Sequence, residues 1–271
     1  MRLAIEHTSR YDYSQPASHG LLRIRLKPKS THGQSIVEWS MELEGAKVET
    51  EYEDQHNNAV VLASVNSNVS HVVVRCHGTV ETSDNAGIIG QHAGHMPLWA
   101  FTVPTALTRP GPQIRKLAAS IGNRPESLLE GLHELSNRVL EAVKYEIGRT
   151  DSGTSAEQAM QAGHGVCQDH AQIFISAVRE LAVPARYIGG YLMMDDRSEQ
   201  EAGHAWAEAY VPDLGWVGFD VSNGISPDER YVRVATGCDY RDAAPIAGIS
   251  YGTGDSELEV RLSVEQQSSA Q

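Results

Sequence analysis

Apolar and polar positions alternate through residues 1–85, which is the pattern of strands with one buried face. Segment 20–28 alternates leucine and isoleucine with arginine from Leu22 until Pro28 closes it. Further strand-like segments follow at short spacing, and the aspartates and asparagines between them are typical of turns. These segments are 3–11, 35–43, 47–53, 59–65 and 70–80. The pattern predicts a small all-β domain over residues 1–90, arranged as a sandwich or a barrel.

The apolar spacing changes to helical steps of three and four residues after residue 113. Helices are predicted over 114–121 and 126–147. The segment Thr154-Ser155-Ala156-Glu157 fits a capping box that opens a short helix ending at about Gln161. A further helix begins near Cys167 and ends before Pro184. Strand-like segments follow at 185–194, 204–211, 215–220 and 258–264.

Helices followed by strands predict an α+β core over residues 113–250, with its helices packed on an antiparallel sheet. Glycines and prolines break both periods within residues 91–112, so we interpret this stretch as a linker between the all-β domain and the core. Residues 251–271 then hold the C-terminal strand and a tail.

The chain is acidic, with a formal net charge of −13 over 271 residues, of which 41% are hydrophobic. Excess negative charge argues against nucleic acid or an anionic membrane surface as the main partner. The three cysteines are too few, and odd in number, for a disulfide framework. Because the start of the chain has no apolar signal segment and no stretch approaches a membrane span, we expect a cytoplasmic protein with reduced thiols.

Cys167 is the leading candidate for chemistry. It follows a glycine-bearing turn and precedes a run of apolar residues at helical spacing, which places it at or near a helix N-terminus. Unpaired N–H groups and the positive end of the helix dipole favour the thiolate there. Since the thiolate is the nucleophilic form of cysteine, this position is suited to covalent catalysis.

His204 and Asp220 are the expected partners of Cys167. His204 opens one strand and Asp220 ends the next, and a short connection makes these strands antiparallel neighbours. The two side chains should therefore lie side by side, with His204 as general base and Asp220 orienting its ring. The backbone N–H of Cys167 is a candidate oxyanion donor. Gln161 and Trp99 are weaker candidates for a second donor.

Simpler interpretations of these residues stay open at this point. A cysteine is more often a small buried residue than a nucleophile, and an aspartate before a turn is common turn chemistry. A zinc site of His164, Cys167 and His170, completed by His204, is disfavoured because no CxxC or HExxH signature appears. We therefore expect no metal and no cofactor.

Several ordered motifs resemble the transglutaminase-like superfamily, in particular its bacterial branch of candidate cysteine proteases. These motifs are GVCQDHA at 165–171, PARYIGGYL at 184–192, HAWAEAYV at 204–211, GWVGFDVSNG at 215–224 and VRVATGCDYRDAAPIAG at 232–248. The opening, with YDY at 11–13 and LRIRLKP at 22–28, resembles the N-terminal β domain of that branch. The resemblance covers nearly the whole chain.

The resemblance implies a papain-like α+β core behind an N-terminal β domain, and a Cys–His–Asp triad on Cys167, His204 and Asp220. Cys238 stands where the family commonly has arginine, so an essential catalytic role is not expected for it. Related proteins cross-link glutamine side chains to amines, hydrolyse peptides or remove glycans from asparagine, all through an acyl-enzyme. No DxDxDG calcium loop occurs in the sequence, so calcium dependence is not expected.

The sequence thus leads to a hypothesis of a cysteine-dependent amide-bond hydrolase acting through a thioester. Members of this branch are implicated beside peptide-ligase-type partner proteins, which implies a peptide or isopeptide substrate. Acyl transfer from glutamine to an amine is the alternative reaction. A non-catalytic binding or scaffold protein is the alternative of another class.

Overall fold

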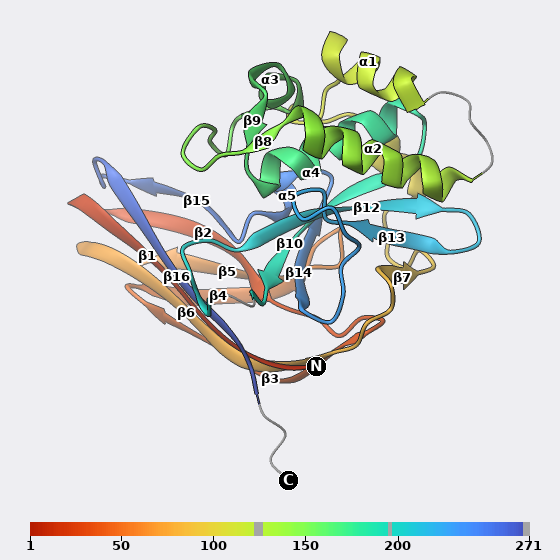
Figure 1. The fold of residues 1–271 in the computed structure, drawn as a ribbon. Coiled ribbons are helices and arrows are strands. Elements are labelled where there is room, and N and C mark those ends of the chain that lie inside the picture. The colour runs from red at the N-terminus through yellow and green to blue at the C-terminus, as the bar shows by residue number, and fades with distance from the viewer. Residues whose placement is uncertain (122–126, 195–196, 268–271) are drawn as a thin grey trace.

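The computed structural model describes residues 1–121, 127–194 and 197–267. Helices form the upper layer in Figure 1, an antiparallel sheet lies directly beneath them, and a larger β unit closes the lower side. This order of layers places the start of the helix that begins at Cys167 against one end of the strands of the middle sheet, where the candidate site lies.

The β unit is a sandwich of two antiparallel sheets. One sheet runs in the order β11 (Glu199–Gln200), β16 (Ser256–Gln266), β1 (Arg2–Ala17), β6 (Val69–Thr82) and β3 (Gln34–Glu44). The other runs in the order β15 (Ile246–Tyr251), β2 (His19–Lys27), β5 (Ala59–Val65) and β4 (Ala46–Glu53). Alternate residues of β2, β5 and β6 meet between the sheets and exclude water, which confirms the predicted sandwich-like β domain.

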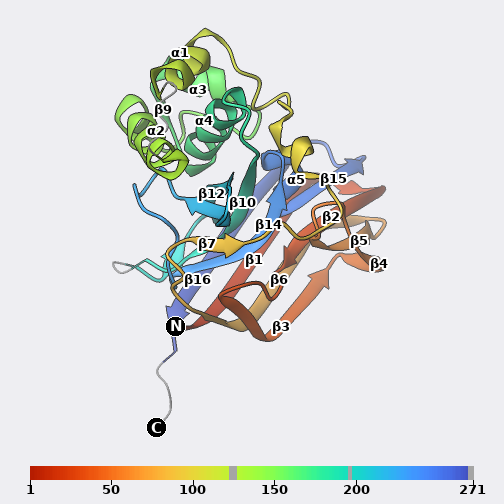
Figure 2. The same ribbon diagram turned by 90° about the vertical axis from the view of Figure 1, so that its right-hand side faces the viewer.

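The last two strands of the chain belong to this β unit and not to the core. β16 pairs with β1 from Leu3↔Gln266 to Tyr13↔Ser256, and β15 pairs with β2 (Figure 2). The predicted boundary at residue 250 therefore falls inside a strand of the other unit. Local periodicity could not reveal this, because pairing between strands this far apart in sequence leaves no local pattern.

The core combines the middle sheet with helices on one face. The sheet order is β14 (Tyr231–Gly237), β10 (Ala185–Leu192), β12 (His204–Val211), β13 (Gly215–Phe219) and β7 (Ile88–Gly90). The helices are α1 (Pro112–Ile121), α2 (Leu128–Ala142), α3 (Ala156–Ala162), α4 (Cys167–Glu180) and α5 (Tyr240–Ala243). Their apolar faces share one buried cluster with β10, β12 and β13, so the predicted α+β arrangement is confirmed.

Helix boundaries differ from the predicted ones in two places. α2 ends at Ala142, and β8 (Lys144–Tyr145) then pairs in parallel with β9 (His164–Gly165). The predicted first residue of that helix, Glu126, lies outside the described residues. The capping box of α3 uses Ser155 and Gln158 rather than Thr154 and Glu157.

The predicted linker packs on the core. Its η1 turn (Leu98–Thr102) buries Phe101 against Trp216, with ring centroids 5.2 Å apart. The indole N–H of Trp216 donates to His92 Nδ1 at 3.1 Å. Residues 91–112 therefore run from β7 to the start of α1, both in the core, and the chain crosses from the β unit to the core between β6 and β7.

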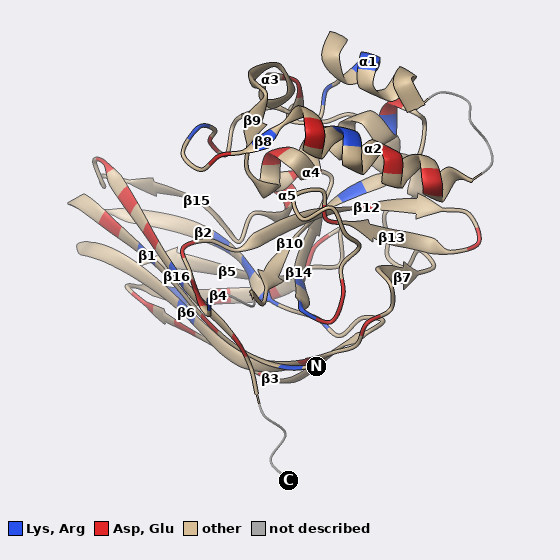
Figure 3. Cartoon of the chain, in the orientation of Figure 1, with Lys and Arg blue, Asp and Glu red and all other residues tan. Residues whose placement is uncertain are grey.

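Buried charges of the middle sheet are compensated within it. Glu208 accepts from Arg186 at 2.6 Å and from Arg233 at 2.9 Å, and its own side chain is completely buried. On the strands of the β unit, positively and negatively charged residues intermingle (Figure 3).

None of the helices in the described ranges is both long and apolar enough to span a membrane.

Candidate active site

The first turn of α4 presents Cys167. α3 ends at Ala162, the φ of 70° at the capping residue Gly163 turns the chain into β9, and Val166 then precedes α4 in an extended conformation. The carboxylate of Asp169 accepts from the Val166 N–H at 2.8 Å and from the Thr150 hydroxyl at 2.7 Å. These bonds fix the start of the helix, where backbone N–H groups have no partner inside the helix.

His204 and Asp220 lie in direct contact. β12 and β13 are antiparallel, with Ala207 opposite Phe219, so the first residue of β12 meets the residue that follows β13. His204 Nε2 is 2.6 Å from Asp220 Oδ2. The structure thus brings these two predicted site residues together where β12 begins and β13 ends, as their antiparallel pairing predicted.

The side chains of Cys167 and His204 interact, which joins the three predicted residues in one chain of contacts. Because Nε2 of His204 is taken by Asp220, Nδ1 is the ring nitrogen left to face the thiol. The Cys167 side chain is half-buried, whereas Asp220 is completely buried. Cys167 therefore lies nearer to the protein surface than the carboxylate of Asp220.

Asp220 is held as an anion by several donors. The Tyr231 hydroxyl donates to Asp220 Oδ2 at 2.6 Å, and the Asn223 side-chain amide donates to the same oxygen at 2.7 Å. Burial opposes ionisation of the carboxyl, but the bonds to His204, Tyr231 and Asn223 outweigh it and lower the pKa of Asp220.

The pKa of His204 is shifted in the opposite direction from that of Asp220. Burial disfavours the imidazolium, yet hydrogen bonds and charge interactions with Asp220 and Cys167 raise the pKa of His204 to about 10. The environment therefore favours a positively charged ring beside the carboxylate of Asp220 and next to Cys167, which is a position from which a base can serve a cysteine nucleophile.

Tyr145 is a site residue that the sequence did not indicate. It is hydrogen-bonded to Cys167, and burial together with the nearby Cys167 and Asp220 raises the pKa of its phenol to about 12. The phenol therefore stays protonated and available as a donor beside the sulfur. The parallel pairing of β8 with β9 sets Tyr145 opposite Gly165, two residues before Cys167, and nothing in the local sequence signals that pairing.

The two weaker oxyanion candidates are not brought to Cys167 by any described contact. Gln161 lies on α3, where its amide donates to Glu157 at 3.2 Å in an exposed position. Trp99 lies in η1, with 69% of its surface exposed. A second donor at Gln161 or Trp99 therefore stays a prediction, and Tyr145 is a further candidate because it interacts with Cys167.

The alternative zinc site is disfavoured by the surroundings of His170. Both of its ring nitrogens are engaged, Nδ1 with Ser222 Oγ at 2.9 Å and Nε2 with the Val143 carbonyl at 3.0 Å. Burial lowers the pKa of His170, so the ring stays neutral while it makes these two hydrogen bonds. His170 thus supports the turn that carries Asp220 and is not free to bind a metal with Cys167.

Tyr231 and Asn223 were also outside the predicted site. Asn223 follows Asp220 in the same turn, which is a sequence signal for a side chain that bonds the aspartate. Tyr231 opens β14, a strand that the periodicity did not predict, so its approach to Asp220 could not be foreseen.

Comparison with known proteins identifies the family of the chain. Residues 115–221 match the transglutaminase-like superfamily, and residues 3–81 match the bacterial transglutaminase-like N-terminal region. The chain belongs to the transglutaminase-like superfamily and combines its core with that N-terminal region.

Individual relatives extend over different parts of the chain. An uncharacterized protein of Mycobacterium leprae is 26% identical over 284 residues, which cover 97% of this chain and 98% of that protein. An uncharacterized protein of Mycobacterium tuberculosis is 32% identical over 155 residues, which cover 54% of this chain and 49% of the relative. A crystal structure from Cytophaga hutchinsonii, described as a "putative cysteine protease", covers 100% of this chain and 92% of its own at 23% identity. Its TM-score of 0.77 establishes that the two proteins share a fold.

Proposed function

We propose that this protein is a cysteine-dependent amide-bond hydrolase that acts on a peptide or isopeptide through a thioester acyl-enzyme. The observation that carries the proposal is the continuous chain of contacts from Cys167 through His204 to Asp220, built at a helix start. A buried histidine is held between a thiol and a carboxylate, which is the arrangement that nucleophilic catalysis by cysteine requires.

Acylation would begin with the thiol proton on His204. The Cys167 thiolate attacks the amide carbon, and the carbonyl becomes a tetrahedral oxyanion. His204 then gives its proton to the leaving nitrogen as the C–N bond breaks, which releases the amine and leaves a thioester on Cys167. Asp220 stabilises the imidazolium in both steps through the 2.6 Å contact with Nε2.

Two donors are suited to the oxyanion. The backbone N–H of Cys167 lies in the first turn of α4, where N–H groups are free of helical partners. The Tyr145 phenol, which is hydrogen-bonded to the sulfur, can pass that bond to the oxygen that forms on the adjacent carbon. A preorganised donor of this kind lowers the energy of the transition state more than that of the substrate.

The exposure of the site favours water as the second nucleophile. Cys167 is half-buried and Tyr145 is 51% exposed, so solvent can reach a thioester on the sulfur. His204 would take a proton from that water, and the hydroxide would release the acid and regenerate the thiol. Transfer of the acyl group to an amine is the competing outcome, and it follows the same first half of the reaction. The peptide-ligase-type partner stays a prediction from the family resemblance.

The test is the pH dependence of Cys167 alkylation by iodoacetamide, followed by intact-mass analysis with peptides and isopeptides. We expect fast labelling of Cys167 well below pH 7, slower labelling in His204→Ala, and no labelling of this position in Cys167→Ala. Cys76→Ala is the matched control, because burial raises the pKa of Cys76 to about 12 and makes it unreactive.

Product analysis separates the two reactions. A free acid formed equally with and without added primary amine supports hydrolysis, whereas an amide of the added amine supports acyl transfer. Labelling that rises only near the ordinary cysteine pKa of about 8.5 would contradict an activated thiolate and favour a binding or scaffold protein.

A further inference from the structure

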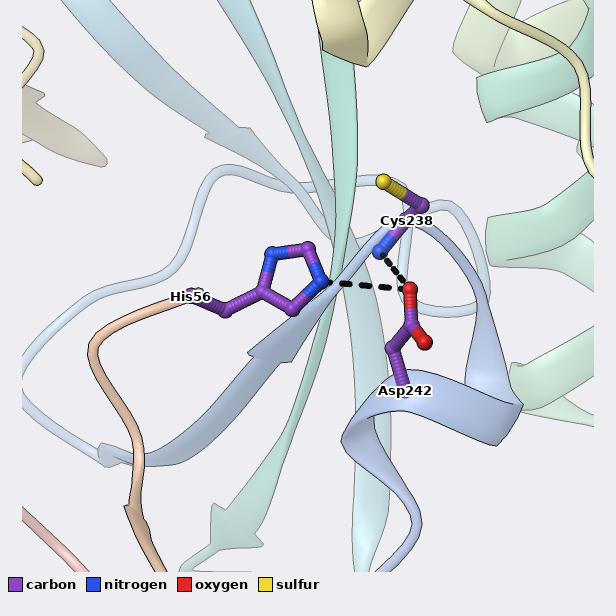
Figure 4. A group of neighbouring side chains, drawn as sticks. All are labelled: His56, Cys238 and Asp242. Atoms are coloured by element: carbon purple, nitrogen blue, oxygen red, sulfur yellow. Dashed lines mark hydrogen bonds and ion pairs between the residues drawn. The ribbon is translucent and has the colours of Figure 1, made fainter. Parts of the chain in front are cut away.

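A second cysteine, histidine and carboxylate group lies where the β unit meets the core. Figure 4 shows His56 from the turn between β4 and β5, Cys238 just after β14, and Asp242 on α5. One ligand atom of each residue lies within 4.8 Å of the other two. His56 is far in the sequence from Cys238 and Asp242, which are four residues apart, and the proposed catalytic mechanism uses none of the three.

The turn that carries His56 is firmly anchored. Asp54 Oδ1 accepts from the backbone N–H groups of His56 and Asn58, both at 3.0 Å. The Asn58 side chain donates to the Thr236 carbonyl at 2.7 Å and accepts from the Thr236 N–H at 2.8 Å. These contacts fix the imidazole over the end of β14, so its position is set before any ligand arrives.

Hydrogen bonds also hold Cys238 and Asp242 in place on the core side. The Cys238 N–H donates to Asp242 Oδ2 at 3.0 Å, and the Cys238 carbonyl accepts from Arg179 at 2.7 Å. Asp239 caps α5 by accepting from the Arg241 N–H at 2.8 Å. Ligands fixed by such surroundings lose little freedom on binding a metal.

The geometry of the pair His56 and Asp242 has the dimensions of a metal site. Nε2 of His56 is 3.2 Å from Asp242 Oδ2. Two ligands at normal zinc distances on one tetrahedral ion lie about 3.3 Å apart. The His56 side chain is only 1% exposed, and its Nε2 faces Asp242. An ordinary surface ion pair does not account for a ring buried to this degree.

We propose that His56 Nε2, the Cys238 sulfur and the Asp242 carboxylate form a Zn²⁺ site with one position left to water. Nitrogen, sulfur and oxygen donors of these types suit zinc, and a thiolate with a carboxylate neutralises its two charges. The nearby cations are otherwise engaged, because Arg25 pairs with Asp54 at 2.9 Å and Arg179 is bonded to carbonyl groups. The ion would join the β4–β5 turn to the end of β14 and thereby tie the β unit to the core.

The experiment uses the full chain with Cys167→Ala, because Cys167 and His204 are themselves a cysteine and a histidine that could capture an ion. Metal-depleted protein is titrated with Co²⁺ and followed by absorbance, and Zn²⁺ affinity is measured by competition with a coloured chelator. We expect one ion per chain and a thiolate-to-cobalt absorption band. The melting temperature should rise with added Zn²⁺ because the ion binds the folded state.

Variants of the three ligands decide the proposal. Cys167→Ala/Cys238→Ala should lose the thiolate band and the zinc-dependent rise in melting temperature. His56→Gln and Asp242→Asn should each weaken zinc binding by about 100-fold or more, since loss of a supporting residue alone costs about 10- to 100-fold. Cys76→Ala in the same background should change neither quantity.

Two outcomes would overturn the proposal. The first is zinc affinity and a cobalt spectrum that are the same with and without Cys238. The second is a Cys167→Ala protein that binds no zinc with measurable affinity while keeping the melting temperature of the unsubstituted chain. Either result would leave His56 and Asp242 as a plain ion pair at the boundary of the two units.

Discussion

Tyr231 donates its hydroxyl proton to the same oxygen of Asp220 that contacts His204, at 2.6 Å in both cases. The tyrosine therefore competes with the histidine for one lone-pair region while stabilising the negative charge that the histidine needs. Removing it has two separable effects, one on the fold and one on the titration of Asp220.

Tyr231→Phe should raise the pKa of Asp220 towards its ordinary value, because one donor to the carboxylate is lost. We expect a loss of about 1.5–3 kcal/mol in the free energy of unfolding, typical of a hydrogen bond to a charged group. Denaturant titration measures it, and the acid limb of the Cys167 alkylation profile should move to higher pH. An unchanged acid limb would show that Tyr231 has no influence on the charge of Asp220.

Tyr145→Phe tests the oxyanion donor. Loss of one such donor lowers kcat by about 10²- to 10³-fold, and KM should change little because the bond forms only in the transition state. Gln161→Ala and Trp99→Phe are the comparison variants, and both should keep full activity because neither side chain has a described contact with Cys167. Equal losses in all three variants would point to a structural cause.

Asp220→Asn should lower kcat by about 10²- to 10⁴-fold, because an amide no longer stabilises the imidazolium of His204. The same change should slow alkylation of Cys167 below pH 7, where the thiolate depends on a charged partner. Asn223→Ala is a milder control, since it removes one donor to the carboxylate and keeps the charge. Activity that survives Asp220→Asn would exclude the proposed triad.

The raised pKa of His204 also predicts a pH-dependent stability. In a Cys167→Ala background only Asp220 holds the imidazolium, so His204 stabilises the fold fully below its ordinary pKa of about 6.5. That contribution is lost as the pH rises towards the folded pKa, which is about 10 when the thiolate is present as well. The difference in denaturant midpoint between Cys167→Ala and Cys167→Ala/His204→Gln should therefore shrink above pH 6.5. A difference that stays constant from pH 5.5 to 10 would contradict the charged ring.

The buried cluster around Glu208 predicts the largest effect on folding. Glu208→Ala leaves the guanidinium groups of Arg186 and Arg233 without their shared carboxylate, which costs about 3–5 kcal/mol for a buried ion pair. The exposed pair Arg261 and Glu259 supplies the control, because Glu259→Ala should change stability by no more than about 0.5 kcal/mol. Equal effects of the two substitutions would show that burial does not decide the strength of these pairs.

The sequence was sufficient to predict the strands of residues 1–85 and the contact between His204 and Asp220, whereas β11 and β15 of the β unit were not predicted. Period-two alternation marks β2 directly, and a short connection forces β12 and β13 to be antiparallel neighbours. The position of Cys167 at a helix start followed from glycine and apolar spacing. These features are local, so local patterns carry them.

Contacts between distant segments were beyond such reasoning. β8 and β9 each contain two residues, which is too short for any period, yet their pairing brings Tyr145 to the thiol. β14 is buried at all but one position and its sequence shows no clean alternation, so Tyr231 was not expected beside Asp220. The group of His56, Cys238 and Asp242 forms only because two units of the fold meet.

The pairing of β16 with β1 makes the core an insertion within the β unit. In Figure 1 the red β1 and the blue β16 lie side by side, although the whole core is encoded between them. During synthesis, β1 and β2 can pair with β16 and β15 only after the end of the chain has left the ribosome. Contacts of such long sequence separation form slowly. A fragment cut at residue 90 would expose the edges of both sheets and present them to other chains. The two units therefore form one folding unit, and dissecting the protein requires excising the core and rejoining the strands on either side of it.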